Sequence, residues 1–148
     1  IDRVCESGPA VFNHNLETVP RLYGIARKGS SYERSLGVLK CAKEFNAMIY
    51  TKSGIMLGLG EEWDEIFSVF KDLRSVHCDI LTVGQYLRPS LKQLPVLRFY
   101  SPEEFKAIAD QARRMGFKHV ESGPLVRSSY HAWQHAESVF AHENTAVS

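Results

Sequence analysis

The sequence predicts an α/β protein, namely a partial (β/α) barrel in which parallel strands alternate with outer helices. Strand-like and helix-like runs follow one another along the chain, which is the order typical of parallel strands joined by crossover helices. The 148 residues suit one domain of ordinary size. About four strand–helix units are visible, whereas a closed barrel of this type needs eight units and roughly 250 residues.

The first third of the chain predicts one strand and two helices. Ala10–Asn15 has the apolar start and polar end of a strand. Glu17–Ile25 suits a short helix, although Pro20 restricts where that helix can begin. Tyr32–Phe45 carries apolar residues at spacings of three, typical of a helix with one buried face, and Ser30 or Ser31 can cap it.

The middle of the chain predicts two further strands around a helix. Ala47–Leu57 is a second strand that ends in a Gly-Leu-Gly turn. Glu62–Ser75 is a helix with one apolar stripe, and acidic residues in its first turn complement the positive end of the helix dipole. Asp79–Leu87 is the third strand.

The remaining part predicts one more helix and strand. Leu91–Phe99 is expected to be irregular because prolines interrupt it. Ser101 precedes a proline and stands three residues before a glutamate, which predicts a capped helix over Pro102–Met115. Gly116 ends that helix and Lys118–Glu121 forms the fourth strand. We expect residues 1–137 to form the barrel part and residues 138–148 to be a flexible tail.

Composition and charge exclude several classes of protein. The chain is 44% hydrophobic, and none of its apolar runs approaches the roughly 18–20 residues needed to span a bilayer. Its net charge of +1 excludes the whole-domain positive field of a non-specific nucleic-acid binder. We therefore expect neither a membrane nor a nucleic acid as a partner.

The three cysteines lie far apart in the sequence. No two of Cys5, Cys41 and Cys78 lie within 30 residues of each other, which excludes a Cys-x-x-Cys pair and a dense disulfide scaffold. The odd number favours a reducing compartment, and we expect each cysteine to be a small buried hydrophobe. The chain begins at Ile1 with turn residues directly before a strand, so we expect it to start in mid-fold, as part of a longer protein.

The carboxyl ends of the predicted strands are polar and glycine-rich, as expected where this class of fold carries its chemistry. These ends are Asn13–Glu17, Lys52–Gly54, Gly58–Glu61, Gly84–Tyr86 and Ser122–Pro124. The turn of Gly58, Leu59 and Gly60 either admits a ligand close to the backbone or is a plain turn.

Two alternatives are open for the first strand end. Asn13, Asn15 and Glu17 alternate with a period of two, so two amides and a carboxylate would point in one direction and suit a ribose. Alternatively, Glu17 begins a helix that Asn15 caps. His14 points the other way and is expected to be packed.

The segment after the fourth strand does not predict a hydrolase. No carboxylate, histidine and serine stand at a spacing typical of a catalytic triad. Either Ser128 or Ser129 could cap a helix that starts near His131. His131 and His135 lack the glutamate of a zinc-protease motif.

Taken together, these motifs resemble the lipoyl synthase family of radical S-adenosylmethionine enzymes. The matching stretches, in family order, are F-N-H-N-L-E-T-V-P-R-L-Y from Phe12, T-K-S-G-I-M-L-G-L-G-E from Thr51, D-I-L-T-V-G-Q-Y-L-R-P-S from Asp79, and G-F-K-H-V-E-S-G-P-L-V-R-S-S-Y-H from Gly116. They extend from about Val11 to His135, and the R-S-S-Y part is the most specific.

The resemblance implies a barrel of the radical S-adenosylmethionine type and a sulfurtransferase activity. Such enzymes insert two sulfur atoms at carbons 6 and 8 of an octanoyl chain on a lysine of a carrier domain. The implied cofactors are S-adenosylmethionine and two four-iron, four-sulfur clusters, one radical-generating and one auxiliary. The implied partners are an electron donor and octanoylated carrier domains, namely the E2 subunits of 2-oxoacid dehydrogenases and the glycine cleavage H protein. Bacterial members are cytoplasmic, whereas eukaryotic ones are mitochondrial or plastid.

The resemblance also assigns residues. Asn15 and Glu17 match the pattern that meets the ribose of S-adenosylmethionine. Gly54, Met56, Gly58 and Glu61 match a stretch on the adenine side, with methionine in place of the usual isoleucine. The remaining cofactor contacts expected at strand ends are Ser53 and Gln85. Ser129 matches a serine that ligates iron of the auxiliary cluster, with Ser128 as the alternative and Arg127 close by.

This sequence departs from the family in its cysteines. The family carries two cysteine triplets, one per cluster, ahead of the region that matches, and neither triplet is present. We therefore expect the chain to be the C-terminal half of the enzyme and to be inactive by itself. Two alternatives are a sulfur insertion like that of biotin synthase, which R-S-S-Y-H argues against, and a cluster-free half barrel that only binds a carrier protein.

Overall fold

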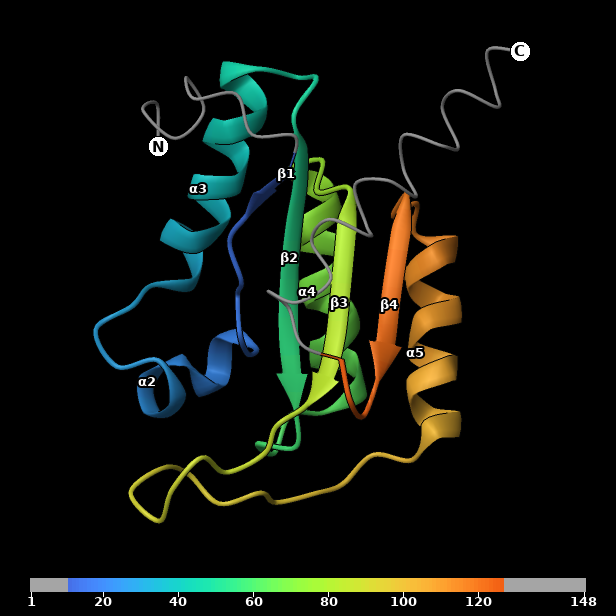
Figure 1. The fold of residues 1–148 in the computed structure, drawn as a ribbon. Helices are drawn as coiled ribbons and strands as arrows, with labels where there is room; N and C mark the ends of the chain where they lie inside the picture. The colour runs from blue at the N-terminus through green and yellow to red at the C-terminus, as the bar shows by residue number, and fades with distance from the viewer. Residues whose placement is uncertain (1–10, 127–148) are drawn as a thin grey trace.

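Four parallel strands form one sheet in the order β1-β2-β3-β4. The computed structural model describes residues 11–126. The strands are β1 (Val11–Asn13), β2 (Tyr50–Leu57), β3 (Ile80–Gln85) and β4 (His119–Gly123). Each strand pairs with the next one along the chain, so every connection between neighbours is a crossover, as Figure 1 shows.

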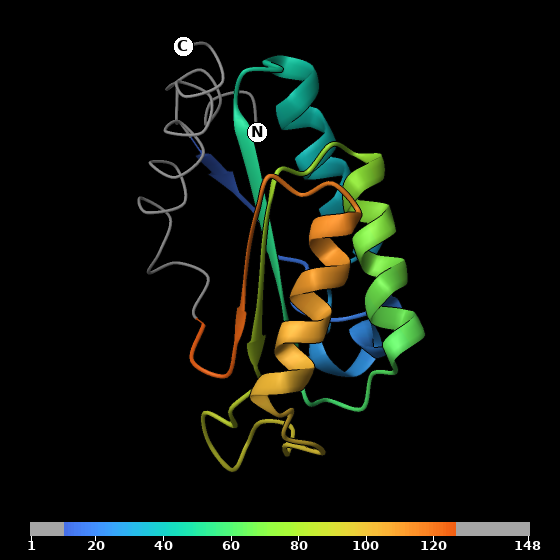
Figure 2. The same ribbon diagram turned by 90° about the vertical axis from the view of Figure 1, so that its right-hand side faces the viewer.

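The helices cover one face of this sheet. They are the 3-10 turn η1 (Pro20–Leu22) and the helices α2 (Tyr23–Ala26), α3 (Tyr32–Phe45), α4 (Trp63–Ser75) and α5 (Pro102–Arg114). Seen along the plane of the sheet, α3, α4 and α5 all lie on the same side of the strands (Figure 2). Within residues 11–126, none of the helices is both long and apolar enough to cross a membrane.

Strand order and helix placement together indicate barrel-like winding. A doubly wound sheet reverses its strand order and carries helices on both faces, whereas here the order is sequential and the helices lie on one face. This arrangement confirms the predicted α/β class with parallel strands and is consistent with part of a (β/α) barrel.

The core lies between the sheet and its helices. Ile55, Leu57, Leu81 and Val83 alternate along β2 and β3 and are buried in the same cluster as the apolar stripes of the helices. The stripe residues include Leu39 of α3, Ile66, Phe70 and Leu73 of α4, and Phe105 and Ile108 of α5. The helical spacing of apolar residues in the sequence thus correctly predicts which face of each helix is buried.

Capping chemistry sets the starts of two helices as predicted. The Ser31 hydroxyl accepts a hydrogen bond from the Arg34 N–H at 3.2 Å, which settles the choice between the two serines before α3. Ser101 and Glu104 form a reciprocal capping box at the start of α5, with both bonds at 3.1 Å. Gly116 follows α5 with φ of 103°, a conformation that favours glycine.

The structure corrects the sequence predictions around the first two strands. β1 ends at Asn13, and Glu17 does not begin a helix but adopts φ of 73° and pairs with Ile55 in an isolated parallel bridge. The first helical turn starts only at Pro20. Lys52–Gly54 is not a strand end, because it lies within β2, whose carboxyl end is at Leu57.

Candidate functional site

Two neighbouring hollows lie around the carboxyl-terminal half of the sheet and the loops that follow it. The first, here called the sheet-end hollow, has a volume of about 10 Å³ and is lined by Asn15, Glu17, Gly54, Ile55, Met56, Thr82, Gly84 and Val126. The second, the rim pocket, has a volume of about 240 Å³ and is lined by Glu17, Thr18, Ile25, Ala26, Arg27, Met56, Leu59, Tyr86, Gln93 and Leu94. Glu17 and Met56 line both, so the two hollows adjoin.

Asn15 and Glu17 reach the sheet-end hollow through the backbone path after β1. The Glu17 N–H donates to the Gly54 carbonyl at 3.0 Å, and the Met56 N–H donates to the Glu17 carbonyl at 2.9 Å. These bonds extend the pairing with β2 beyond the end of β1 and hold Glu17 in its left-handed conformation, which is uncommon for a residue other than glycine. The predicted convergence of Asn15 and Glu17 is therefore present, whereas Asn13 is exposed and lines neither hollow.

Glycines in the two central strands make room for this path. A Cβ atom at Gly54 would stand 2.3 Å from the Thr82 hydroxyl oxygen and 3.3 Å from the Asn15 side-chain oxygen. A Cβ atom at Gly84 would stand 2.6 Å from the Val126 carbonyl oxygen. Close approach of neighbouring chain segments therefore requires glycine at both positions.

Glu61 organises the turn after β2 from the inside. Its carboxylate accepts hydrogen bonds from the N–H groups of Gly58 and Leu59 at 3.0–3.1 Å and from the Tyr100 hydroxyl at 2.9 Å. The side chain is buried and lines neither hollow. Gly58 has φ of 117°, so the turn needs glycine there. Contact of Gly58 and Glu61 with a cofactor stays a prediction, and their visible role is to hold this turn.

Gln85 and Ser53 also hold chain segments in place. The Gln85 amide donates to the Arg98 carbonyl at 2.9 Å and accepts from the Tyr100 N–H at 2.9 Å. The Ser53 hydroxyl accepts from the Leu16 N–H at 3.2 Å. Both side chains are buried and line neither hollow. The predicted set therefore divides. Asn15, Glu17, Gly54 and Met56 meet at a hollow, and the others hold the chain segments around it.

The rim pocket contributes residues that the sequence did not single out. It combines the carboxylate of Glu17 with the guanidinium of Arg27, and Tyr86 closes one side with its hydroxyl bonded to the Leu94 carbonyl at 2.7 Å. Burial, aided by the Arg27 charge, lowers the pKa of His14 below its ordinary value. His14 is therefore neutral at pH 7, and its side chain is half-buried rather than fully packed.

Two side chains to which the sequence assigned no role lie along the strands. Thr82 stands two residues before Gly84, and this period of two was the available signal that both face the hollow. Lys52 stands two residues before Gly54 and is fully buried. Burial lowers the pKa of Lys52, and the charge of Glu121 on β4 opposes this shift.

The described residues hold no group of side chains gathered as a metal site. Within residues 11–126, no three His, Cys, Asp or Glu side chains gather as a metal site. Cys41 is exposed on α3, which corrects the expectation that it is buried, whereas Cys78 is buried as expected. The Cys78 thiol donates to the Thr51 and Ile80 carbonyls. The residues predicted near a cluster, Arg127, Ser128 and Ser129, lie outside the described residues, as do Cys5 and residues 138–148.

Comparison with known proteins identifies relatives of this chain. No protein-family model matches it. It is 54% identical to the lipoyl synthase of Koribacter versatilis over 135 residues, covering 91% of this chain and 44% of that protein. Identity to lipoyl synthase 2 of Thermosynechococcus vestitus is 58% over 132 residues, covering 89% and 46%. Identity to the lipoyl synthase of Nitrosococcus oceani is 61% over 124 residues, covering 84% and 38%.

The chain spans less than half the length of these relatives. Within that span the identity is high, and the matches cover most of the chain. The resemblance predicted from the sequence is therefore confirmed: the chain is homologous, along most of its own length, to a part of the lipoyl synthases.

Proposed function

We propose that this chain forms one wall of the active site of a lipoyl synthase, which inserts two sulfur atoms at carbons 6 and 8 of a protein-bound octanoyl-lysine. One observation supports this most. Asn15 and Glu17 from the segment after β1, together with Gly54 of β2, line a single hollow near the carboxyl end of the sheet. They do so in a chain that is 54–61% identical to proteins named lipoyl synthase.

The donor set around Glu17 fits S-adenosylmethionine. An amide and a carboxylate side by side suit the hydroxyl groups of a ribose, as in other nucleotide sites. The sheet-end hollow holds only about 10 Å³, so the adjoining rim pocket of about 240 Å³ supplies the volume for a nucleoside. When bound, S-adenosylmethionine would supply the radical that removes hydrogen from the octanoyl chain.

In this proposal the chain positions and shields the reacting groups. A primary alkyl radical attacks whatever C–H bond is nearest, so the ligand must be held firmly and away from water. Glu17 is fixed by two backbone hydrogen bonds to β2. The turn after β2 and the loop after β3 are held by the buried Glu61 and Gln85. These contacts provide a rigid rim at the site.

Iron–sulfur clusters do not fit the described part of the chain. Such clusters are normally held by several cysteine thiolates, whereas the whole sequence has three widely separated cysteines. Of the two that are described, one is exposed on α3 and the other is hydrogen-bonded in the core. We infer that the cluster ligands come from sequence beyond this chain, that this chain is the C-terminal half, and that it does not turn over alone.

The test compares the chain alone with the reading frame extended upstream to two cysteine triplets. Both proteins are reconstituted anaerobically with iron and sulfide, and iron, acid-labile sulfide, 5′-deoxyadenosine and lipoyl product are measured with an octanoyl-lysine peptide. We expect the chain alone to hold less than one cluster and to form no product. The extended protein should form lipoyl peptide, and Glu17→Gln should raise its KM for S-adenosylmethionine at least 10-fold.

A matched variant separates the site from general effects of charge. Glu44 is exposed on α3, at the outer side of the helices, so Glu44→Gln should leave the KM for S-adenosylmethionine unchanged. Two complete clusters on the 148-residue chain would refute its inactivity. Sulfur insertion into dethiobiotin instead of the octanoyl peptide would replace the proposed substrate class.

A further inference from the structure

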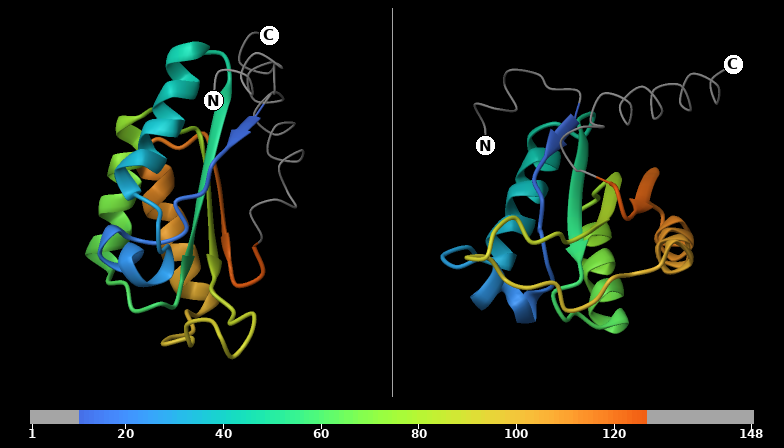
Figure 3. Two further views of the ribbon diagram at one scale, coloured as in Figure 1. Left: turned by 90° about the vertical axis from the view of Figure 1, so that its left-hand side faces the viewer. Right: turned by 60° about the horizontal axis from the view of Figure 1, so that its bottom comes forward.

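We propose that the loop between β3 and α5, residues 86–100, is the surface on which an acidic carrier protein docks to present its acyl-lysine. This rests on the proposed function, since it concerns how the same site receives a protein-borne substrate. We call residues 86–100 the rim loop. Figure 3 shows this loop extending past the carboxyl ends of the strands toward α2 and returning to α5.

The rim loop is basic and apolar at once. It carries Arg88, Lys92 and Arg98 and no acidic residue, although the whole chain has a net charge of only +1. Four of its large apolar side chains are exposed: Leu87 by 41%, Leu91 by 86%, Leu97 by 66% and Phe99 by 69%. Exposed apolar groups beside positively charged side chains are typical of a surface that binds a partner.

Two of the three positive charges are available to a partner. Arg98 is paired with Glu104 and lies over the ring of Tyr100. Within residues 11–126, no carboxylate pairs with Arg88 or Lys92. The Arg88 guanidinium instead donates to the carbonyls of Leu91 and Gln93, at 2.8 and 2.9 Å, and so shapes the tip of the loop.

The rim loop is held in place despite its irregular backbone. The Gln85 amide binds the Arg98 carbonyl, the Leu97 N–H donates to the Gly58 carbonyl at 2.8 Å, and the Tyr86 hydroxyl binds the Leu94 carbonyl. A loop fixed at its two ends and in the middle loses little conformational entropy when a partner binds. Preorganisation of this kind raises affinity.

The position of the rim loop connects it to the site. Tyr86, Gln93 and Leu94 of this loop line the rim pocket together with Ile25 and Arg27. A substrate chain attached to a protein must enter from the rim, so the carrier has to contact whatever surrounds the entrance. At this entrance the rim loop supplies the exposed apolar and basic side chains that a carrier would contact. Because the loop is positively charged, the facing surface of the carrier has to be acidic.

The experiment uses the full-length enzyme that contains this chain and measures KM for two substrates. These are the octanoylated glycine cleavage H protein and a short octanoyl-lysine peptide. Lys92→Glu and Leu91→Ser should each raise the KM for the H protein roughly 3- to 10-fold and change the KM for the peptide less than 2-fold. Raising the salt concentration should weaken binding of the H protein to the unmodified enzyme more than to Lys92→Glu.

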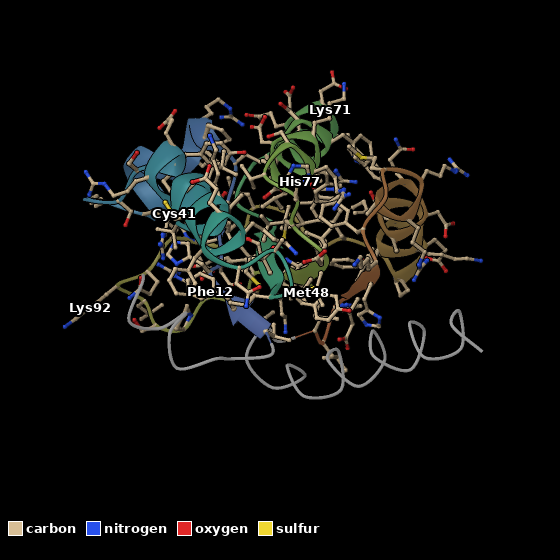
Figure 4. The ribbon with its side chains drawn as sticks, turned by 90° about the horizontal axis from the view of Figure 1, so that it is seen from above. Phe12, Cys41, Met48, Lys71, His77 and Lys92 are labelled. Carbon is tan, nitrogen blue, oxygen red and sulfur yellow. The ribbon has the colours of Figure 1, made fainter. Side chains whose placement is uncertain are left out.

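Two matched controls lie elsewhere on the molecule. Lys71 is an exposed lysine on α4, and Figure 4 places it on the opposite side of the molecule from Lys92. Met48 is 82% exposed and lies before β2, at the amino end of the sheet. Lys71→Glu and Met48→Ser should leave both KM values unchanged.

The outcomes separate this proposal from the proposed function. An unchanged KM for the H protein in both rim-loop variants overturns the docking surface. So does equal impairment with the H protein and the peptide, since the loop then serves the fold or the small-molecule site. If the unmodified enzyme converts neither substrate, the proposed function fails. Direct titration of the H protein against the same variants then decides the docking surface alone, with unchanged affinity as the refuting result.

Discussion

Replacing Glu61 tests whether the turn after β2 depends on one buried carboxylate. Glu61→Ala removes the acceptor for the N–H groups of Gly58 and Leu59 and for the Tyr100 hydroxyl. A buried donor left unpaired costs about 1–3 kcal/mol. Glu61→Ala leaves two backbone N–H donors unpaired, whereas the Tyr100 hydroxyl keeps the Glu61 backbone carbonyl as a second acceptor at 3.5 Å. We therefore expect a decrease of about 3–5 kcal/mol in the free energy of unfolding.

Glu61→Gln separates the charge from the hydrogen bonds. Its amide oxygen can still accept from the backbone, and its NH₂ group can donate to the Tyr100 hydroxyl, which then acts as acceptor. Glu61→Gln therefore loses only the extra strength that the negative charge gives to these hydrogen bonds, and one weak bond. We expect the free energy of unfolding to decrease by about 1–2 kcal/mol. The exposed Glu103 offers a control, because Glu103→Gln should change stability by less than about 0.5 kcal/mol.

Urea unfolding followed by circular dichroism measures these differences, and thermal melting checks them. About 1 kcal/mol corresponds to roughly 2–4 °C in a domain of this size, so Glu61→Ala should lower Tm by roughly 6–20 °C. If Glu61→Ala unfolds at the same urea concentration as the unmodified chain, the carboxylate does not hold the turn. If Glu61→Gln loses as much stability as Glu61→Ala, the charge and not the hydrogen bonding is decisive.

Three further predictions concern the strands, the cysteines and alkaline pH. Gly54→Ala places a Cβ atom 2.3 Å from a side-chain oxygen of β3, so it should cost about 1–3 kcal/mol in urea unfolding and weaken S-adenosylmethionine binding in calorimetry. Burial raises the pKa of the Cys78 thiol to about 12, so at pH 8 peptide mapping should find Cys41 alkylated and Cys78 unmodified until urea is added; equal labelling in the native state contradicts this. Burial and the hydrogen bond to Asp72 raise the pKa of Tyr32. The neutral hydroxyl therefore stabilises the fold fully below about pH 10 and progressively less above it. Tyr32→Phe should flatten that decline between pH 9 and 11.

Local chemistry in the sequence accounts for most of the helices and strands. The 14 residues of α3 coincide with the predicted helix, because a serine cap and an apolar face at helical spacing act within a few neighbours. The capping box at Ser101 likewise sets the start of α5. By contrast, the sequence placed the start of a helix at Glu17, where backbone bonds to Gly54 and Met56 of β2 instead hold the chain beside that strand, with Glu17 in a left-handed conformation.

In the candidate site, too, the sequence predicted some features correctly and the tertiary contacts decided others. The motifs named Asn15, Glu17 and Gly54, and these do meet at one hollow. The same motifs also named Ser53, Glu61 and Gln85, whose side chains turn inward to bind backbone groups of neighbouring segments. A motif records which residue types a family keeps at a site, and it cannot distinguish a side chain that faces the hollow from one that supports its wall.

The sequence by itself thus determined the α/β class, the helix boundaries set by caps, and the relationship to lipoyl synthases. Only the tertiary structure decided which strand-end residues face the two hollows and how the rim loop is held beside the pocket. It also decided that Glu17 pairs with β2 and does not begin a helix. The physical reason is the separation of the interacting residues along the chain. Helix caps and apolar periodicity depend on residues within one or two helical turns of each other. Bonds that shape the site also join distant residues, such as Ser53 to Leu16, 37 positions apart, and Tyr100 to Glu61, 39 positions apart.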